Sequence, residues 1–129
     1  MILLCDENIG TNVPKALSLV GYDARSLFQM GWAGKPDTYW LAQAGRLGWL
    51  VYSCNKKMLQ VPSERAVIKN AHFGIIFLTN GEEYLAKQLR LLLGKWSWLE
   101  SLDCLQPRPF AMFLSPSGRV SNSYRDLKL

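Results

Sequence analysis

The first apolar segment of the chain is followed at once by acidic residues. Residues 2–5 are apolar, and Asp6, Glu7 and Asn8 come directly after them. A short apolar run bounded by polar residues predicts a buried strand, and parallel α/β sheets bind ligands beyond the carboxyl ends of their strands. A carboxylate pair at that place suits a cation or a proton that takes part in a reaction. The alternative is a strand-to-helix turn that Asp6 caps, with no chemistry of its own.

Two further polar segments border predicted strands or helices, as residues 6–8 do. Asp37 follows the glycine-rich residues 31–36 and precedes a helical pattern, so it suits a metal ligand, the N-cap of that helix, or both at once, because the cap needs only one carboxylate oxygen. Asn55, Lys56 and Lys57 follow the next apolar run. The two lysines suit contacts with the phosphates of RNA, and the alternative is an ordinary solvated turn.

Strand and helix patterns alternate along the chain, and the strands would position these residues. After the first strand, the patterns predict strands at 22–28, 49–53 and 74–78 with helices between them, then a β-hairpin from 110–114 and 120–124. Such alternation predicts a mostly parallel sheet. Short right-handed crossovers give the strand order 2-1-3-4, so the first and third strands end at one crevice. Asp37 approaches this crevice if its loop folds inward.

The last predicted helix is the least regular. It runs over residues 82–93 from a capping box of Asn80 and Glu83, and it turns Leu85, Leu89 and Leu92 to the core. A tryptophan-rich segment at 95–102 either extends this helix or follows it.

The composition bounds the class of protein. The chain has 129 residues, 49% of them hydrophobic, which predicts one domain over residues 1–129. No apolar run approaches the ~20 residues of a membrane span, and no signal peptide is expected. Three widely spaced cysteines predict a reduced, cytoplasmic setting. The net charge of +5 favours an anionic partner such as nucleic acid.

The polar segments together resemble those of small bacterial PIN-like proteins, relatives of the toxin ribonucleases of toxin–antitoxin pairs. That family has a strand ending in Asp-Glu-Asn, as at residues 6–8, and a second Asp in a glycine-rich context, as at Asp37. It then has a strand that enters a Thr-x-Asp-x-Asp-Phe turn, where this chain has residues 53–58. The resemblance implies a three-layer α/β/α, Rossmann-like PIN-like domain that holds Mg²⁺ or Mn²⁺ and cleaves RNA.

The third segment departs from the family pattern. If Ser53 stands for the Thr, Asn55 and Lys57 occupy the places of the two Asp residues. Asn offers an oxygen without charge, and an ammonium group ~4 Å from the ion would oppose its binding by several kcal/mol at an effective dielectric constant of ~20. A standard two-metal site is therefore not expected.

The sequence leads to two hypotheses. The first is a metal-dependent endoribonuclease, the toxin of a toxin–antitoxin pair, with weakened activity. Its catalytic residues would be Asp6, Glu7, Asp37 and Asn55, with Asp6 and Asp37 as metal ligands. Its expected partners are RNA, an antitoxin protein and, in a homodimer, a second copy of the chain. The second hypothesis is a non-catalytic PIN-like module that binds RNA or a protein.

Overall fold

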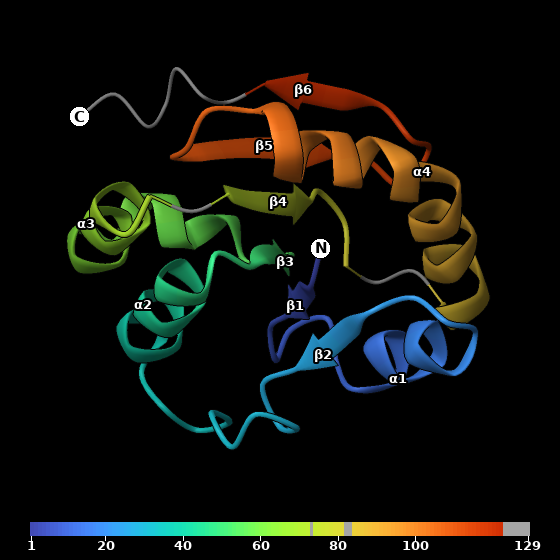
Figure 1. Ribbon diagram of the computed structural model, residues 1–129, viewed down its shortest axis with the longest axis horizontal. Coiled ribbons are helices and arrows are strands. Elements are labelled where there is room, and N and C mark those ends of the chain that lie inside the picture. The colour runs from blue at the N-terminus through green and yellow to red at the C-terminus, as the bar shows by residue number, and fades with distance from the viewer. Residues whose placement is uncertain (73, 82–83, 123–129) are drawn as a thin grey trace.

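The computed structural model describes residues 1–72, 74–81 and 84–122 as alternating strands and helices (Figure 1). The strands are β1 (Leu3–Cys5), β2 (Ala24–Ser26), β3 (Leu50–Ser53), β4 (Gly74–Leu78), β5 (Phe110–Leu114) and β6 (Val120–Asn122). The helices are α1 (Asn12–Leu19), α2 (Asp37–Leu47), the 3₁₀-helix η1 (Lys56–Gln60), α3 (Pro62–Asn70) and α4 (Leu85–Leu105).

In the described part of the chain, six strands form one sheet in the order β2-β1-β3-β4-β5-β6. Neighbouring strands are parallel except for β5 and β6, which form an antiparallel C-terminal hairpin. β1, β3 and β4 consist of buried residues only, as central parallel strands covered on both faces require. The predicted 2-1-3-4 order is confirmed, and β5 and β6 extend it beyond β4.

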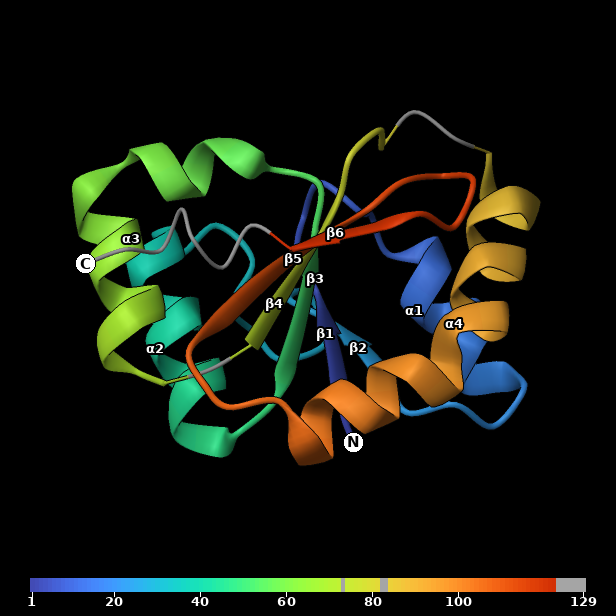
Figure 2. The ribbon, with the colours of Figure 1, turned by 90° about the horizontal axis from the view of Figure 1, so that it is seen from above.

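Helices cover both faces of the sheet, so the fold has three layers (Figure 2). α1 and α4 lie on one side, where Leu3 and Tyr52 belong to the core. α2 and α3 lie on the other side, where the core includes Leu4, Val51 and Trp40. Successive strand residues point to opposite faces, so the unbroken apolar runs supply both cores at once. The predicted α/β/α architecture is confirmed.

In the described part of the chain, the helices α1 to α4 begin at the same edge of the sheet. Each of them connects two parallel strands, so it must run back along the sheet from the carboxyl end of one strand to the start of the next. We call the edge beyond Cys5, Ser26, Ser53 and Leu78 the carboxyl edge, and the opposite one the amino edge. The positive ends of the helix dipoles lie at the carboxyl edge.

β2 is shorter than the strand predicted at 22–28. The backbone N–H of Ser26 donates to Oε1 of Gln29 at 2.8 Å, and the N–H of Gln29 donates to Oγ of Ser26 at 3.1 Å. These bonds turn the chain after Ser26. As a result Leu27 is buried, whereas Phe28 is 74% exposed on the loop that follows.

α4 is one helix of 21 residues, so the segment at 95–102 extends the predicted helix. Leu92 is buried and Leu89 packs against the core as predicted. The core position predicted for Leu85 is wrong, because this first residue of the helix is 39% exposed at the carboxyl edge. The predicted capping box includes Glu83 and the predicted last strand reaches residue 124, and both positions lie outside the described residues.

None of the described helices combines the length and the apolar composition that crossing a membrane requires. The cytoplasmic setting stays a prediction.

Candidate functional site

Asp6 ties the end of β1 to the end of β3. It is 2% exposed, and its Oδ1 accepts hydrogen bonds from the N–H groups of Asn8 and Ile9 at 3.0 and 3.2 Å. Its Oδ2 accepts the hydroxyl of Ser53. The Oγ of Ser53 in turn accepts the N–H of Asn55 at 2.9 Å. The structure thus brings Asp6 and the start of the lysine turn together, and it also gives Asp6 the turn-capping bonds of the alternative interpretation.

The pKa of Asp6 is raised to about 6. Burial removes water from the carboxylate and is the larger cause, whereas the hydrogen bonds from Ser53, Ile9 and Asn8 act in the opposite direction. At neutral pH Asp6 is therefore mostly ionised, and it takes up a proton in mildly acidic solution.

Glu7 is exposed and holds a neighbouring loop. Its Oε1 accepts the N–H of Gly34 at 2.7 Å, across 27 positions of the chain. Gly34 has a φ of +79°, a conformation that side chains other than that of glycine rarely adopt. This bond fixes the connection between β2 and α2 against the end of β1.

Asp6 and Glu7 line one small pocket of about 160 Å³ at this place. The rest of its lining comes from the start of the β1–α1 connection and from the β2–α2 connection, namely Gly10, Thr11, Ser26, Leu27, Phe28 and Ala33.

Asp37 lies in a separate carboxyl pair. It is the first residue of α2, and Pro36 is the N-cap, so the alternative role of Asp37 as N-cap is wrong. Its Oδ1 accepts the indole N–H of Trp40 at 2.9 Å. The carboxyl group of Glu64, in the first turn of α3, is hydrogen-bonded to Asp37, and the pKa of Glu64 is raised to about 7 by burial first and by Asp37 second.

Sequence reasoning missed Glu64. The signal that could have found it is its place as the third residue of a helix, seven residues after Lys57. Helices on the same face of a parallel sheet start at the same edge, so acidic residues in their first turns can meet. Asp37 and Glu64 do so because α2 and α3 pack side by side.

The lysine turn is a short 3₁₀-helix. Asn55 is half-buried just before η1, and Lys56 and Lys57 are exposed at its start. A groove of about 550 Å³ adjoins η1 along α3, with Arg65 and Lys69 among its lining residues. Lys56, Lys57 and Arg65 therefore bring positive charge to this side of the carboxyl edge, which also holds the Asp37–Glu64 pair.

The carboxyl groups suit a divalent ion unequally. Asp37 and Glu64 are in contact, and Mg²⁺ in proteins takes one or two carboxylates plus water and phosphate oxygens. Both oxygens of Asp6 already accept hydrogen bonds, so a metal ion would compete with Ser53 or with backbone donors. Within residues 1–72, 74–81 and 84–122, no three His, Cys, Asp or Glu side chains form a group that could hold a metal. The metal site at Asp6 and Asp37 stays a prediction, to which the structure adds Glu64.

A three-layer α/β/α domain with polar groups at its carboxyl edge is of the class that binds ligands beyond its strand ends. Residues 1–80 match the family described as PIN like domain, a stretch that spans β1 to β4. The chain belongs to this PIN-like domain family, whose members are generally related to nucleases. No match was found among curated proteins or among solved structures.

Proposed function

We propose that this PIN-like domain is a metal-dependent endoribonuclease with weakened activity. The observation that carries the proposal is the contact between the carboxyl groups of Asp37 and Glu64. Near neutral pH this pair holds a proton, and a divalent cation that replaces the proton would relieve the repulsion between two carboxylates. Mg²⁺ or Mn²⁺ bound there would supply positive charge to a phosphodiester under attack by water.

The turn after β3 would hold the RNA. Lys56 and Lys57 are exposed at the carboxyl edge, where each can contact a phosphate as a point charge. Asn55 would assist with its amide group. Asp6 would act as a positioning residue, because it holds Ser53 and Ser53 fixes the backbone of Asn55.

The weakening follows from the residues that replace carboxylates. Asn55 and Lys57 stand where the family resemblance expects two Asp residues, so fewer negative charges face the metal. Metal affinity rises with the number of charged ligands. Slow cleavage that needs high Mn²⁺ concentrations is therefore expected.

The biological role that we propose is that of the toxin in a toxin–antitoxin pair. An antitoxin protein would bind the domain and block RNA cleavage, and the domain would form a homodimer. Co-expression with the product of an adjacent gene should then suppress cleavage, and light scattering should give the mass of two chains. Undiminished cleavage in the presence of each adjacent gene product would remove the toxin role and leave the nuclease proposal intact.

The test of the nuclease proposal is cleavage of fluorescent single-stranded RNA with Mn²⁺ or with a chelator. Asp37→Asn and Glu64→Gln should each lower the Mn²⁺-dependent rate by at least about tenfold, as the loss of a metal-site group commonly does. Asp23→Asn is the matched control, because Asp23 is exposed just before β2, at the amino edge. Cleavage that survives chelation, or that Asp37→Asn leaves unchanged, would contradict the proposal.

A second candidate is a non-catalytic module that binds RNA. The occupied oxygens of Asp6 and the replacement of two carboxylates by Asn55 and Lys57 favour it. It predicts salt-sensitive RNA binding that persists in chelator, with intact RNA after long incubation at high Mn²⁺ concentration.

A further inference from the structure

We propose that the pocket beside Asp6 and Glu7 takes one nucleobase of the bound RNA and that Phe28 stacks on that base. This inference rests on the proposed function, since it names a part of the RNA that the same edge would recognise. It assigns a binding role to Phe28 and to the β2–α2 connection.

The size of the pocket fits one base. Its volume is about 160 Å³, well below the roughly 300–1,000 Å³ of sites that enclose a drug-sized ligand. A single planar ring system suits this space, whereas a whole nucleotide would leave its sugar and phosphate outside. Leu27 and Ala33 give the pocket apolar walls that suit a ring face.

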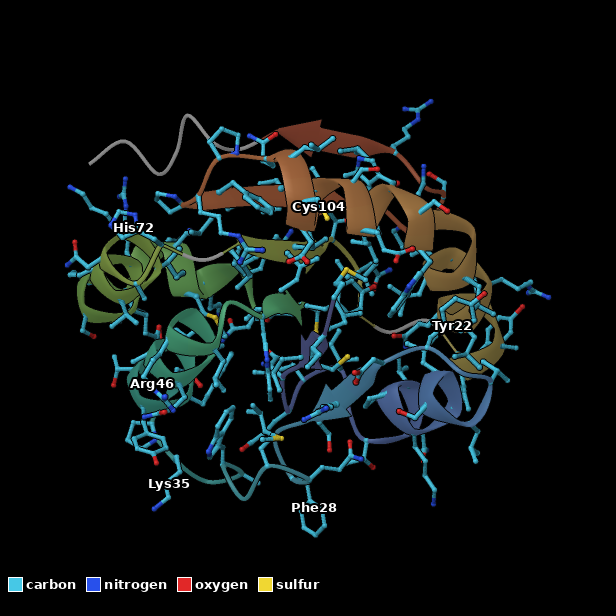
Figure 3. All side chains as sticks on the ribbon, in the orientation of Figure 1. Tyr22, Phe28, Lys35, Arg46, His72 and Cys104 are labelled. Carbon is cyan, nitrogen blue, oxygen red and sulfur yellow. The ribbon has the colours of Figure 1, made fainter. Side chains whose placement is uncertain are left out.

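Phe28 is placed for stacking by the turn at the end of β2. The bonds between Ser26 and Gln29 end the strand, and they leave Phe28 74% exposed while it still lines the pocket. Figure 3 shows Phe28 pointing out from the body of the molecule. Single exposed apolar side chains are common on proteins. Phe28 differs from other exposed apolar residues because it lines a pocket at the carboxyl edge. Leu105, for example, is 80% exposed at the end of α4, at the amino edge, and lines none of the pockets described here.

One polar group at the pocket selects the kind of base. Glu7 is exposed there and offers a carboxylate, which only accepts hydrogen bonds when ionised, whereas both oxygens of Asp6 already accept hydrogen bonds within the protein. Gly34 holds the Glu7 side chain in place through Oε1. A base edge rich in N–H donors complements the carboxylate of Glu7, and guanine offers an imino and an amino donor side by side. Uracil offers a single imino donor between two carbonyl oxygens, so it fits least.

The surroundings provide for the phosphates that flank such a base. Lys35 lies in the same β2–α2 connection as Phe28, and Figure 3 shows both side chains projecting from that part of the molecule. The Nζ of Lys35 is 5.7 Å from the ring centroid of Tyr39, which steadies the ammonium group at the surface. A pocket that Glu7 lines, with Lys35 in the connection that supplies Phe28, matches a strand whose base enters the pocket and whose phosphates stay outside.

The test is binding of a short oligouridine that carries one central guanosine, measured by fluorescence anisotropy in chelator. Phe28→Leu keeps an apolar side chain without a ring face and should weaken binding by on the order of tenfold, the usual scale for one stacked base. Phe28→Trp keeps the stacking surface and should bind within about twofold of the unmodified protein. Ala33→Leu fills the pocket from the other wall and should weaken binding without touching the ring. Leu105→Ala is the exposed control and should change nothing.

Two results would overturn the inference. They are equal binding by the Phe28→Leu and unmodified proteins, and equal binding of the guanosine oligomer and plain oligouridine. If Lys56→Ala, Lys57→Ala weakens RNA binding while Phe28→Leu does not, the base pocket fails and the proposed function stands. If the unmodified protein binds no RNA at all, both fail.

Discussion

The carboxyl edge of this domain has two sides of opposite character. Around β1 and β2, Asp6 and Glu7 line a small pocket with apolar walls. Around η1 and α3, Lys56 and Lys57 are exposed beside a groove that contains Arg65. The difference indicates that the β1–β2 side receives the hydrogen-bond donors of a base, whereas the η1 side receives phosphate and also carries the Asp37–Glu64 pair that would hold the metal. Four predictions test this division, in order of falling expected effect.

The largest effect is expected where the two sides are joined. Ser53→Ala removes two hydrogen bonds, the one that the hydroxyl donates to Asp6 and the one that its oxygen accepts from the N–H of Asn55. Ser53 is fully buried, so water cannot replace these bonds. Leaving such buried groups unpaired should lower the free energy of unfolding by about 2–4 kcal/mol. Urea unfolding measures it. Ser63→Ala, at an exposed position of α3, should change the value by less than about 0.5 kcal/mol; equal losses in the two variants would show that the two sides are not joined through Ser53.

The next prediction concerns pH. Asp6 has a pKa of about 6 instead of 3.8, and Glu64 of about 7 instead of 4.5, so the folded state holds both protons to higher pH than the unfolded state. The stabilisation of the folded state is therefore complete below about pH 4 and is lost as pH rises through about 6 for Asp6 and about 7 for Glu64. The part due to Asp6 is about 3 kcal/mol. Asp6→Asn should make the free energy of unfolding, measured with urea from pH 4 to 8, fall less steeply with pH. Asp23→Asn is the exposed control. If the free energy of unfolding of Asp6→Asn falls as steeply as that of the unmodified protein, burial of Asp6 does not control the fall.

A smaller effect is expected on the basic side. Lys56→Ala, Lys57→Ala should weaken binding of single-stranded RNA, because each lost phosphate contact removes about 0.7 from the log–log slope of affinity against salt. The slope should become shallower by about one to one and a half units. Arg46→Ala removes one charge near the end of α2, at the amino edge, and should leave the slope unchanged. If the double variant and the unmodified protein have the same slope, the two lysines form an ordinary solvated turn and do not contact phosphate.

The order of the strands and the edge at which the site lies could be predicted from the sequence, whereas the side-chain contacts within the site could not. Strand order and the shared edge follow from the apolar runs and from the handedness of short crossovers, so the meeting of the ends of β1 and β3 could be predicted. The bond between Asp6 and Ser53 joins residues 47 positions apart, and its burial depends on packing that no local pattern specifies. Glu64 was missed for the same reason, because its partner Asp37 lies on another helix.

Local chemistry misled the prediction in two other places. The alternating pattern at 22–28 favours a strand, but the bonds between Ser26 and Gln29 end β2 early and expose Phe28. An Asp after a proline resembles an N-cap, yet Pro36 is the cap and Asp37 is already helical. Both errors lie in the connection between β2 and α2, where side-chain bonds rather than periodicity decide the backbone.

The most direct test of the central claim is calorimetric titration with Mn²⁺ of the unmodified protein, of Asp37→Asn and of Asn55→Asp, Lys57→Asp. If the Asp37–Glu64 pair holds the metal and the nearby lysine turn weakens its binding, the unmodified protein should bind Mn²⁺ weakly. Asp37→Asn should then abolish the heat of binding, and the double substitution should tighten binding by about tenfold or more, since it restores two charged ligands. Binding that is the same in all three proteins would contradict the account, because neither Asp37 nor the lysine turn would then face the metal.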